Sequence, residues 1–360
     1  MPASGSPAEQ STLNVAVVGA GAFGHNHVRV YRELQDAGLP VALVAIVEPE
    51  PSRAAALHQQ YRVPVYACAE ACLADKSGLR VDAASVCVPT SAHFEVASAL
   101  LSAGIDVLVE KPIAATLQQA DALIALAAAE RRTLQIGHLE RFNPAITAVE
   151  PHINCPMFFE VHRLSVFTPR ALDVDVVLDL MIHDLDIVLS FARSAVREVR
   201  AVGLPILSHK VDIANVRLEF ESGAVANFTA SRVSTERVRK LRFFQPRQYV
   251  SIDYARKDLL VINVDRTDGI DTSPGAPLSA PPALSFPIPS LAAGLSFQKP
   301  AVMPGEPLRL EIESFLSAIR HRTRPRVSAE DGRAALALAL EINQAIAEHA
   351  DRAGLDRFHI

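Results

Sequence analysis

Val15-Ala16-Val17-Val18 runs directly into Gly19-Ala20-Gly21-Ala22-Phe23-Gly24 near the start of the chain. An apolar strand followed by G-x-G-x-x-G and a helix is the context in which this motif binds a dinucleotide. The glycines allow a tight turn, a close approach of the backbone to a pyrophosphate, and close helix–strand packing. The N-terminus of the helix favours the anion. We therefore expect the cofactor to contact Gly19, Gly21, Ala22, Phe23 and Gly24.

The rest of the first third repeats this strand–helix alternation. Nearly continuous apolar runs are typical of parallel strands that are covered on both faces. Strands are expected at 15–19, 41–47, 81–88, 106–110 and 133–137, and helices at 24–37, 53–60, 93–103 and 117–131. This alternation predicts an α/β Rossmann domain with a doubly wound parallel sheet over residues 14–137, after a flexible tail at 1–13.

After about residue 144 the pattern changes to longer, alternating strands. They are expected at 157–165, 196–202, 212–221, 224–232, 241–250 and 258–264, with helices at 176–193, 308–320 and 328–350. Gly223 supplies the positive φ of a hairpin. We predict a second α/β domain over 138–360, with a large open antiparallel sheet and helices on its other face. The sequence leaves open whether the C-terminal helices pack back on the Rossmann domain.

Residues 266–306 are interpreted as a Pro-rich insertion without packed structure. Nine of the 24 prolines fall between Pro274 and Pro307. Such a composition favours an extended loop. A variable surface insertion, a lid over the substrate and an arm to another subunit all fit it.

Charge and composition exclude several classes of protein. The net charge of −5, from 35 basic and 40 acidic residues, argues against nucleic acid as a partner. Neither a signal peptide nor an apolar stretch of about 18 residues occurs, so we expect a cytoplasmic protein without a membrane partner. The four cysteines do not form a disulfide framework, and no cluster has the spacing of a metal site.

Residues at the ends of the expected strands extend the cofactor site. Glu48 ends the second strand, where an acid accepts hydrogen bonds from ribose hydroxyls and repels a 2′-phosphate. It therefore favours NAD over NADP, although the nearby Arg53 could neutralise a phosphate. Thr90 and His93 follow the strand at 81–88, and they line the cofactor cleft or form a turn and helix cap. His25 and His27 are interpreted as structural or cofactor-adjacent.

Two further motifs carry acid–base chemistry. Glu110-Lys111-Pro112 ends the strand at 106–110, which places Lys111 at the mouth of the cleft. Asp179 and His183 are four residues apart, on one face of an otherwise apolar helix. A carboxylate beside an imidazole suits proton transfer near neutral pH, but the same pair also fits a structural hydrogen bond.

These motifs together resemble the Gfo/Idh/MocA family of oxidoreductases, over nearly the whole chain except the tail and the Pro-rich segment. The resemblance implies a Rossmann domain followed by an α/β domain with an open sheet. It also implies NAD as cofactor, with Glu110 near it, and Lys111, Asp179 and His183 as the catalytic set.

Within that family the chain is similar to bacterial enzymes that oxidise the 3-hydroxyl of UDP-N-acetylglucosamine. Three segments carry this similarity: 137–144, 163–165 and 175–186. It implies a 3-keto product, a partner aminotransferase and a role in lipid A precursor synthesis. Arginine pairs well with phosphate oxygens, so the plausible ligands of the diphosphate are Arg141, Arg163, Arg170 and Arg232. Asn143 is expected to contact the substrate as well.

Three alternatives stay open from the sequence. One is a dehydrogenase of a free polyol or aldose such as inositol or glucose, which needs no phosphate-binding arginines. Another is a carbon–carbon reductase of the same architecture. The third is a catalytically silent NAD-binding sensor. The open sheet face would be a large apolar patch if bare, so we expect a homo-oligomer formed through that sheet.

Overall fold

The computed structural model describes residues 11–167, 174–264 and 295–355. These residues form two compact units. The first, the Rossmann unit, contains the described residues up to Phe142 together with Gly305–Glu341. The second unit contains the described residues from Asn143 to Pro304 and from Ile342 onward. Most of the Pro-rich segment and Arg170 lie outside the described residues.

The Rossmann unit is built on a parallel sheet. Its described strands have the order β3-β2-β1-β4-β5-β6, and each neighbouring pair is parallel. β1 and β4 are neighbours although β2 and β3 come between them in the chain, so the strand order reverses beside β1. Open α/β sheets bind ligands at such a point. The strands are β1 (Leu13–Val18), β2 (Val41–Val47), β3 (Val65–Tyr66), β4 (Ala83–Val86), β5 (Asp106–Glu110) and β6 (Leu134–Gly137).

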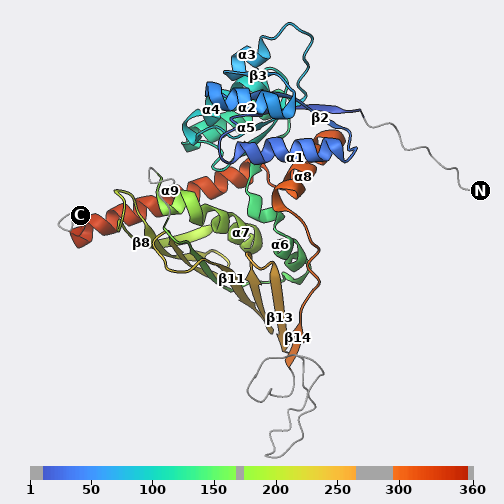
Figure 1. The fold of residues 1–360 in the computed structure, drawn as a ribbon. Coiled ribbons are helices and arrows are strands. Elements are labelled where there is room, and N and C mark those ends of the chain that lie inside the picture. The colour runs from blue at the N-terminus through green and yellow to red at the C-terminus, as the bar shows by residue number, and fades with distance from the viewer. Residues whose placement is uncertain (1–10, 168–173, 265–294, 356–360) are drawn as a thin grey trace, which may run out of the picture. The chain divides into compact units, whose positions relative to one another are not determined.

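Helices cover both faces of this sheet (Figure 1). Capping side chains define two of their starts: Glu50 accepts hydrogen bonds from the N–H groups of Ser52 and Arg53, and Thr116 accepts one from Gln119. The helices are α1 (Gly24–Asp36), α2 (Pro51–Tyr61), α3 (Ala69–Leu73), α4 (Thr90–Ser102), α5 (Leu117–Ala129), η1 (Leu139–Phe142), α8 (Pro307–His321) and the first part of α9 (Ala329–Ala353).

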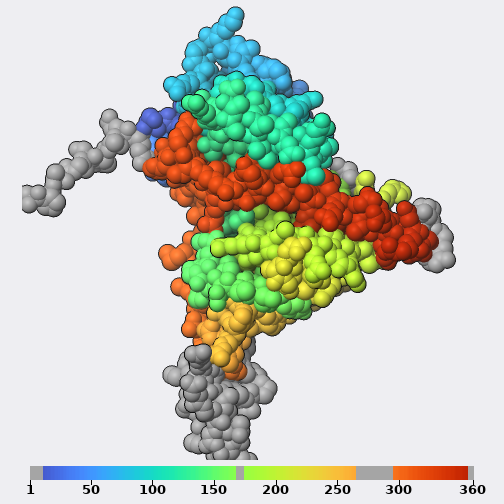
Figure 2. Space-filling view, turned by 180° about the vertical axis from the view of Figure 1, so that it is seen from behind, coloured from blue at the N-terminus to red at the C-terminus, as the bar shows by residue number. Residues whose placement is uncertain are grey.

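Helix α8 comes from the C-terminal part of the chain but packs in the Rossmann core. Its Ile312 and Phe315 are fully buried in one cluster with Val28 and Tyr31 of α1. Figure 1 shows α1 and α8 side by side. In Figure 2 the orange residues of α8 and the start of α9 lie against the blue-green residues of the same unit. The range Gly305–Glu341 thus belongs to the Rossmann unit, whereas the described chain from Ile342 onward belongs to the second unit.

The second unit contains a mixed sheet in which β7 (Phe158–Leu164) is central. The described order is β14-β13-β12-β11-β7-β10-β9-β8, and all pairs are antiparallel except β7 with β10. The other strands are β8 (Val196–Leu204), β9 (Ile213–Phe220), β10 (Val225–Ser231), β11 (Val238–Gln245), β12 (Gln248–Asp253), β13 (Asp258–Val264) and β14 (Leu295–Gln298). Helices of this unit are α6 (Pro144–Val149), η2 (Glu150–His152), η3 (Val177–Met181) and α7 (Ile182–Ala192).

Three sequence expectations differ from this sheet. The single strand expected at 241–250 is wrong, because Arg247 turns the chain with a φ of 62° between β11 and β12. The sheet is mixed instead of antiparallel, since β7 pairs with β10 in parallel. The end of the Pro-rich segment is not a loop, because β14 pairs with β13. The hairpin at Gly223 is confirmed, with a φ of +82°.

The open face of this sheet is more polar than expected. One cross-strand row joins Arg217, Asn227, Glu160 and Arg242, with a hydrogen bond between Arg217 and Asn227 and another between Arg242 and Glu160. Aromatic contacts occur in a neighbouring row, where the rings of Phe158 and Phe244 are 5.6 Å apart. The expectation of a large apolar patch across this face is therefore wrong for its central rows.

Candidate active site

The glycine motif forms the turn between β1 and α1. Gly19 has a φ of +88°, and a Cβ at Gly24 would lie only 1.8 Å from the carbonyl oxygen of Gly19. Nothing lies within 4 Å of the position that a Cβ would take at Gly21, and no side chain caps α1 at Phe23. An uncapped helix N-terminus beside open backbone fits the pyrophosphate of a dinucleotide. Ala22 and Phe23 are exposed at this turn.

Glu48 follows β2 at the same edge of the sheet. Its side chain is almost completely buried, and Oε1 accepts hydrogen bonds from the Glu50 N–H at 2.9 Å and from Arg53 Nη2 at 3.0 Å. Both contacts fix the carboxylate at the strand end, where an adenosine ribose would lie. Arg53 is thus paired with Glu48, and its guanidinium is about half exposed.

Thr90 and His93 lie in the first turn of α4. Thr90 is partly exposed, whereas His93 is almost completely buried. The Nδ1 atom of His93 lies 2.8 Å from the carbonyl oxygen of Pro112, and Nε2 lies 2.9 Å from that of Val88. Burial lowers the pKa of His93, and the two carbonyl contacts oppose that shift. His93 therefore connects the loop after β4 to the loop after β5.

Glu110 and Lys111 stand at the carboxyl end of β5. The Oε1 atom of Glu110 lies 3.0 Å from Nε2 of His27, whose ring is completely buried in α1. The Glu110 side chain lies over β6 at Gly137, where a Cβ would come within 2.7 Å of it. Lys111 is partly exposed, and the Lys111–Pro112 peptide bond is cis. The motif therefore brings an ammonium group to the strand edge that also carries the glycine turn.

Asp179 and His183 belong to the second unit. Asp179 lies in η3, a single π-helical turn, and His183 lies in the first turn of α7. Asp175 starts this segment, since its Oδ1 accepts hydrogen bonds from the N–H groups of Val177 and Leu178. Asp179 and His183 are half-buried in a segment whose other residues are buried or half-buried. Single π turns occur frequently at functional sites.

Arg163 and Asp184 form a buried ion pair beside this helix. Arg163 Nε lies 2.6 Å from Asp184 Oδ2 and Nη2 lies 2.8 Å from Oδ1, and both side chains are almost completely buried. The Arg163 guanidinium also lies over the ring of Tyr254, 5.4 Å from its centroid. Arg163 was predicted to bind phosphate, but here its fork is engaged by the residue next to His183.

The remaining expected substrate residues also have structural contacts. Asn143 is buried and caps α6 through the N–H of Ala145. Arg141, in the Rossmann unit, is mostly buried, with Asp331 at 3.9 Å. Arg232 is buried beside Asp212 and donates to the carbonyl oxygen of Val211.

Sequence reasoning did not anticipate three of these arrangements. The contacts of His27 with Glu110 and of His93 with Pro112 join residues that are far apart in the chain, and so does the pair of Arg163 with Asp184. His27 and His93 share one feature that the sequence shows. Each lies in the first turn of a helix that follows a strand of the parallel sheet. No comparable pattern marks Asp184 as the partner of Arg163.

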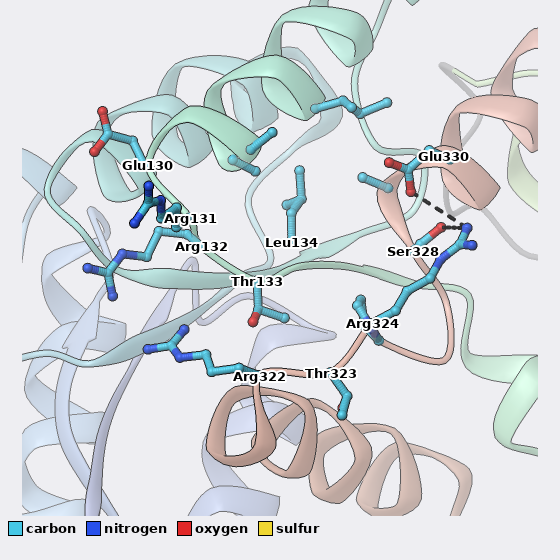
Figure 3. A pocket seen from close by; sticks show the side chains of 15 residues that line it. Glu130, Arg131, Arg132, Thr133, Leu134, Arg322, Thr323, Arg324, Ser328 and Glu330 are labelled. Carbon is cyan, nitrogen blue, oxygen red and sulfur yellow. Dashed lines mark hydrogen bonds and ion pairs between the residues drawn. The ribbon is translucent and has the colours of Figure 1, made fainter.

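A hollow of the Rossmann unit lies away from these residues. This pocket of about 1080 Å³ is lined by Thr133 and Leu134 at the amino end of β6, and by Arg131, Arg324 and Glu330. Figure 3 shows Arg324 on one side of the pocket, where it contacts Ser328 and Glu330. Arg131 lies on the other side. Ligands of open α/β sheets bind at the carboxyl ends of strands. The pocket is therefore at the opposite edge of the sheet from the glycine turn.

The described ranges carry neither a cluster of metal ligands nor a membrane-spanning helix. Across residues 11–167, 174–264 and 295–355 no group of three or more His, Cys, Asp or Glu side chains is arranged to hold a metal. Over the same ranges, no helix combines the length and apolarity that a membrane crossing requires.

Comparisons with known proteins agree with the geometry. Residues 13–138 match the model of the GFO_IDH_MocA oxidoreductase family with an NAD-binding Rossmann fold, and residues 146–247 match a GFO/IDH/MocA C-terminal domain. The chain is 33% identical to UDP-N-acetylglucosamine 3-dehydrogenase from Acidithiobacillus ferrooxidans, over 93% of this chain and 97% of that protein. It is 25% identical to inositol 2-dehydrogenase from Rhizobium meliloti, over 94% and 98% of the two chains.

A solved structure shows the same architecture. The structure of the Acidithiobacillus ferrooxidans enzyme superposes with a TM-score of 0.80 over 93% of this chain and 97% of that one. The two chains are 33% identical over nearly their full length. The two family matches and the glycine turn point to the same family. The chain belongs to the GFO/IDH/MocA family and is an NAD-dependent dehydrogenase.

Proposed function

We propose that the protein oxidises the 3-hydroxyl of UDP-N-acetylglucosamine to the 3-keto sugar, with NAD⁺ as the hydride acceptor. The observation that carries this proposal is the 33% identity to an enzyme of that name over 93% of the chain. The candidate residues support it, because an ammonium group, an imidazole and a carboxylate suit oxidation of an alcohol.

In this proposal the chain's own residues move one proton and stabilise one developing charge. His183 accepts the proton of the sugar hydroxyl, and the carbon–hydrogen bond is broken as the carbonyl forms. Lys111 donates a hydrogen bond to the same oxygen and stabilises its alkoxide character. Asp179 orients His183 or holds a neighbouring hydroxyl. NAD⁺, when bound, supplies the acceptor for the hydride.

The diphosphate of the substrate needs side chains that donate hydrogen bonds to its oxygens. Because Arg163 is bound to Asp184 through both sides of its fork, we assign it to positioning α7. Arg141, Asn143 and Arg170 remain the proposed substrate contacts. Arg170 lies outside the described residues.

A second candidate function is oxidation of a free polyol or aldose. The engagement of Arg163 favours it, since a free sugar needs no phosphate ligand, and the 25% identity to an inositol 2-dehydrogenase spans 94% of the chain. A silent NAD-binding sensor would bind the cofactor but show no turnover with any of these substrates.

The experiment compares kcat/KM for UDP-N-acetylglucosamine, myo-inositol and glucose while reduced nicotinamide is followed by absorbance. Glutamate and an aminotransferase that accepts 3-keto sugars are added to remove product from an unfavourable equilibrium. We expect the nucleotide sugar to be preferred and the Lys111→Ala variant to be inactive. Preference for a free sugar would establish the second candidate, and NAD binding without turnover would favour the sensor.

We also propose that copies of the chain associate through the open face of the second unit's sheet. The rows of Arg217, Asn227, Glu160 and Arg242 offer both charges and amide groups to a second copy. Light scattering of the wild type and of Arg217→Glu tests this, since a dimer held by that face should dissociate in the variant. An unchanged mass would place the contact elsewhere.

A further inference from the structure

The residues on both sides of Lys111 are each held by a buried histidine. On the amino side, the Glu110 carboxylate meets Nε2 of His27 at 3.0 Å, and that ring is completely buried in α1. On the carboxyl side, the carbonyl oxygen of Pro112 lies 2.8 Å from Nδ1 of His93 in α4. Lys111 therefore lies between two anchors that come from two different helices.

Each anchor also reaches a second element of the cofactor edge. His27 lies in the helix that starts at the glycine motif, and its ring packs edge-on against Phe23 with centroids 5.5 Å apart. The second nitrogen of His93 lies 2.9 Å from the carbonyl oxygen of Val88, which follows β4. The segment that carries Lys111 is thus tied to the turn after β1 and to the loop after β4.

Neither contact is explained by packing alone. A buried polar group without a partner destabilises the fold, so an apolar side chain would fill the core more simply at both positions. The Glu110 side chain also needs the space beside Gly137, where a Cβ would lie 2.7 Å from Oε1. The conformation around Lys111 therefore depends on four residues, which are His27, His93, Glu110 and Gly137.

We propose that His27 and His93 are positioning residues that fix Lys111 by holding Glu110 and Pro112 on either side of it. Neither histidine touches the substrate in this proposal. Lysine has four rotatable side-chain bonds, so the place of its ammonium group depends strongly on a fixed backbone. A displacement of about 1 Å at a catalytic group costs about 100-fold in rate, which is the scale expected when an anchor is lost.

The inference rests on the proposed function, because it assumes that Lys111 acts on the substrate oxygen. The variants are His27→Leu and His93→Leu, with His27→Gln and His93→Gln as conservative partners that keep an N–H donor. The control is Leu101→Ala, which removes a fully buried side chain from the same helix as His93 and away from Lys111. It lowers stability because it leaves a cavity in the core.

The first readout separates turnover from binding. We expect each Leu variant to lose about 10- to 100-fold in kcat, while the Kd for NAD changes little. Each Gln variant should recover part of that loss, and Leu101→Ala should keep the wild-type kcat. A kcat that is unchanged in both Leu variants, or lowered equally in Leu101→Ala, overturns the proposal.

The second readout needs no substrate. Acetic anhydride labels lysine amines, and mass spectrometry gives the rate at Lys111 relative to the exposed Lys76. We expect that ratio to rise in the Leu variants and to stay constant in Leu101→Ala. If the wild type turns over none of the sugars, the proposed function fails, and this ratio still decides the positioning role. A constant ratio in both Leu variants overturns that role.

Discussion

The two units hold their candidate residues in different ways. In the Rossmann unit, Glu48, His93 and Lys111 lie at the carboxyl edge of one parallel sheet, and much of their support comes from contacts with backbone atoms of nearby loops. In the second unit, Asp179 and His183 lie on a helix, and the side chain next to His183 is locked by an ion pair with β7. The first arrangement depends largely on contacts with backbone atoms, whereas the second depends on a buried charge pair.

This difference indicates which parts tolerate change. When a loop loses one such hydrogen bond, the free energy of unfolding falls by about 0.5–1.5 kcal/mol. A buried ion pair that loses one partner costs about 3–5 kcal/mol, because the remaining charge stays in the interior. The comparison therefore predicts that substitution of a catalytic residue lowers kcat in either unit. Substitution of a residue that supports the site should lower stability more in the second unit than in the first.

The largest expected effect is on the catalytic rate. If substitutions in only one unit lowered kcat, the comparison of two catalytic units would fail. His183→Ala removes the proposed base, and a positioned base contributes about 10²–10⁴-fold. We expect kcat to fall by that factor, and Lys111→Ala to lower it at least as much through loss of charge stabilisation. Steady-state kinetics with the accepted sugar measures both, and binding of NAD serves as the control. An unchanged kcat in His183→Ala would remove His183 from the chemistry.

The next effect is on stability, and it sharpens the contrast directly. Arg163→Met leaves Asp184 as a buried charge without its guanidinium partner, so β7 and α7 should lose about 3–5 kcal/mol of opening free energy. Hydrogen exchange of their amides measures this quantity locally.

The matched control for that variant is Arg200→Met in the same sheet. Arg200 is 75% exposed and pairs with Glu198 at 2.6 Å. Exposed pairs of this kind contribute about 0–1 kcal/mol. Equal losses in the two variants would mean that burial does not distinguish the pairs.

The same contrast explains how far the sequence predicts this molecule. In the Rossmann unit the glycine motif, Glu48 and Lys111 were placed correctly at strand ends, because βαβ units put consecutive strands into a shared sheet. The short β3 and α3 were not predicted, since two and five residues give no usable periodicity.

In the second unit the strand ranges were mostly predicted, but their pairing was not. The parallel contact of β7 with β10 joins segments about 65 residues apart, and no local pattern specifies it. The sequence predicts one strand at 241–250 because its turn contains no glycine, although Pro246 cannot donate to a sheet ladder and marks the break. The π turn at Asp179 and the partner of Arg163 likewise depend on tertiary contacts.

A smaller effect concerns the cofactor in the Rossmann unit. Glu48→Ser removes the carboxylate that would repel a 2′-phosphate and releases Arg53 from its contact at 3.0 Å. We expect the preference for NAD over NADP, measured as the ratio of kcat/KM values, to narrow by about 1–3 kcal/mol. Glu50→Ala, which removes the capping side chain of α2 beside it, should leave the ratio unchanged. A ratio that stays constant in Glu48→Ser would contradict the ribose role.

The smallest effect concerns a buried acid of the Rossmann core, Glu311, whose carboxyl group has no hydrogen-bond partner among the described residues. Glu311 in α8 is fully buried, and neither of its carboxyl oxygens has a hydrogen-bond partner among the described residues. Burial raises the pKa of Glu311 well above its usual value, and the nearby Glu110 carboxylate raises it further. The folded chain therefore keeps a proton on Glu311 that the unfolded chain releases above about pH 4.5.

This proton makes stability depend on pH with a definite sign. Between the unfolded and folded pKa values of Glu311, the folded state binds more protons, so its contribution to stability falls as pH rises, by at most about 1.4 kcal/mol per pH unit. Glu311→Gln keeps the shape and carries no such proton. Denaturation of both proteins at several pH values above 5 should show the stability of the variant, relative to wild type, increasing with pH. A constant difference would mean that Glu311 is ionised in the folded chain, and that this unit, like the second, holds a buried charge.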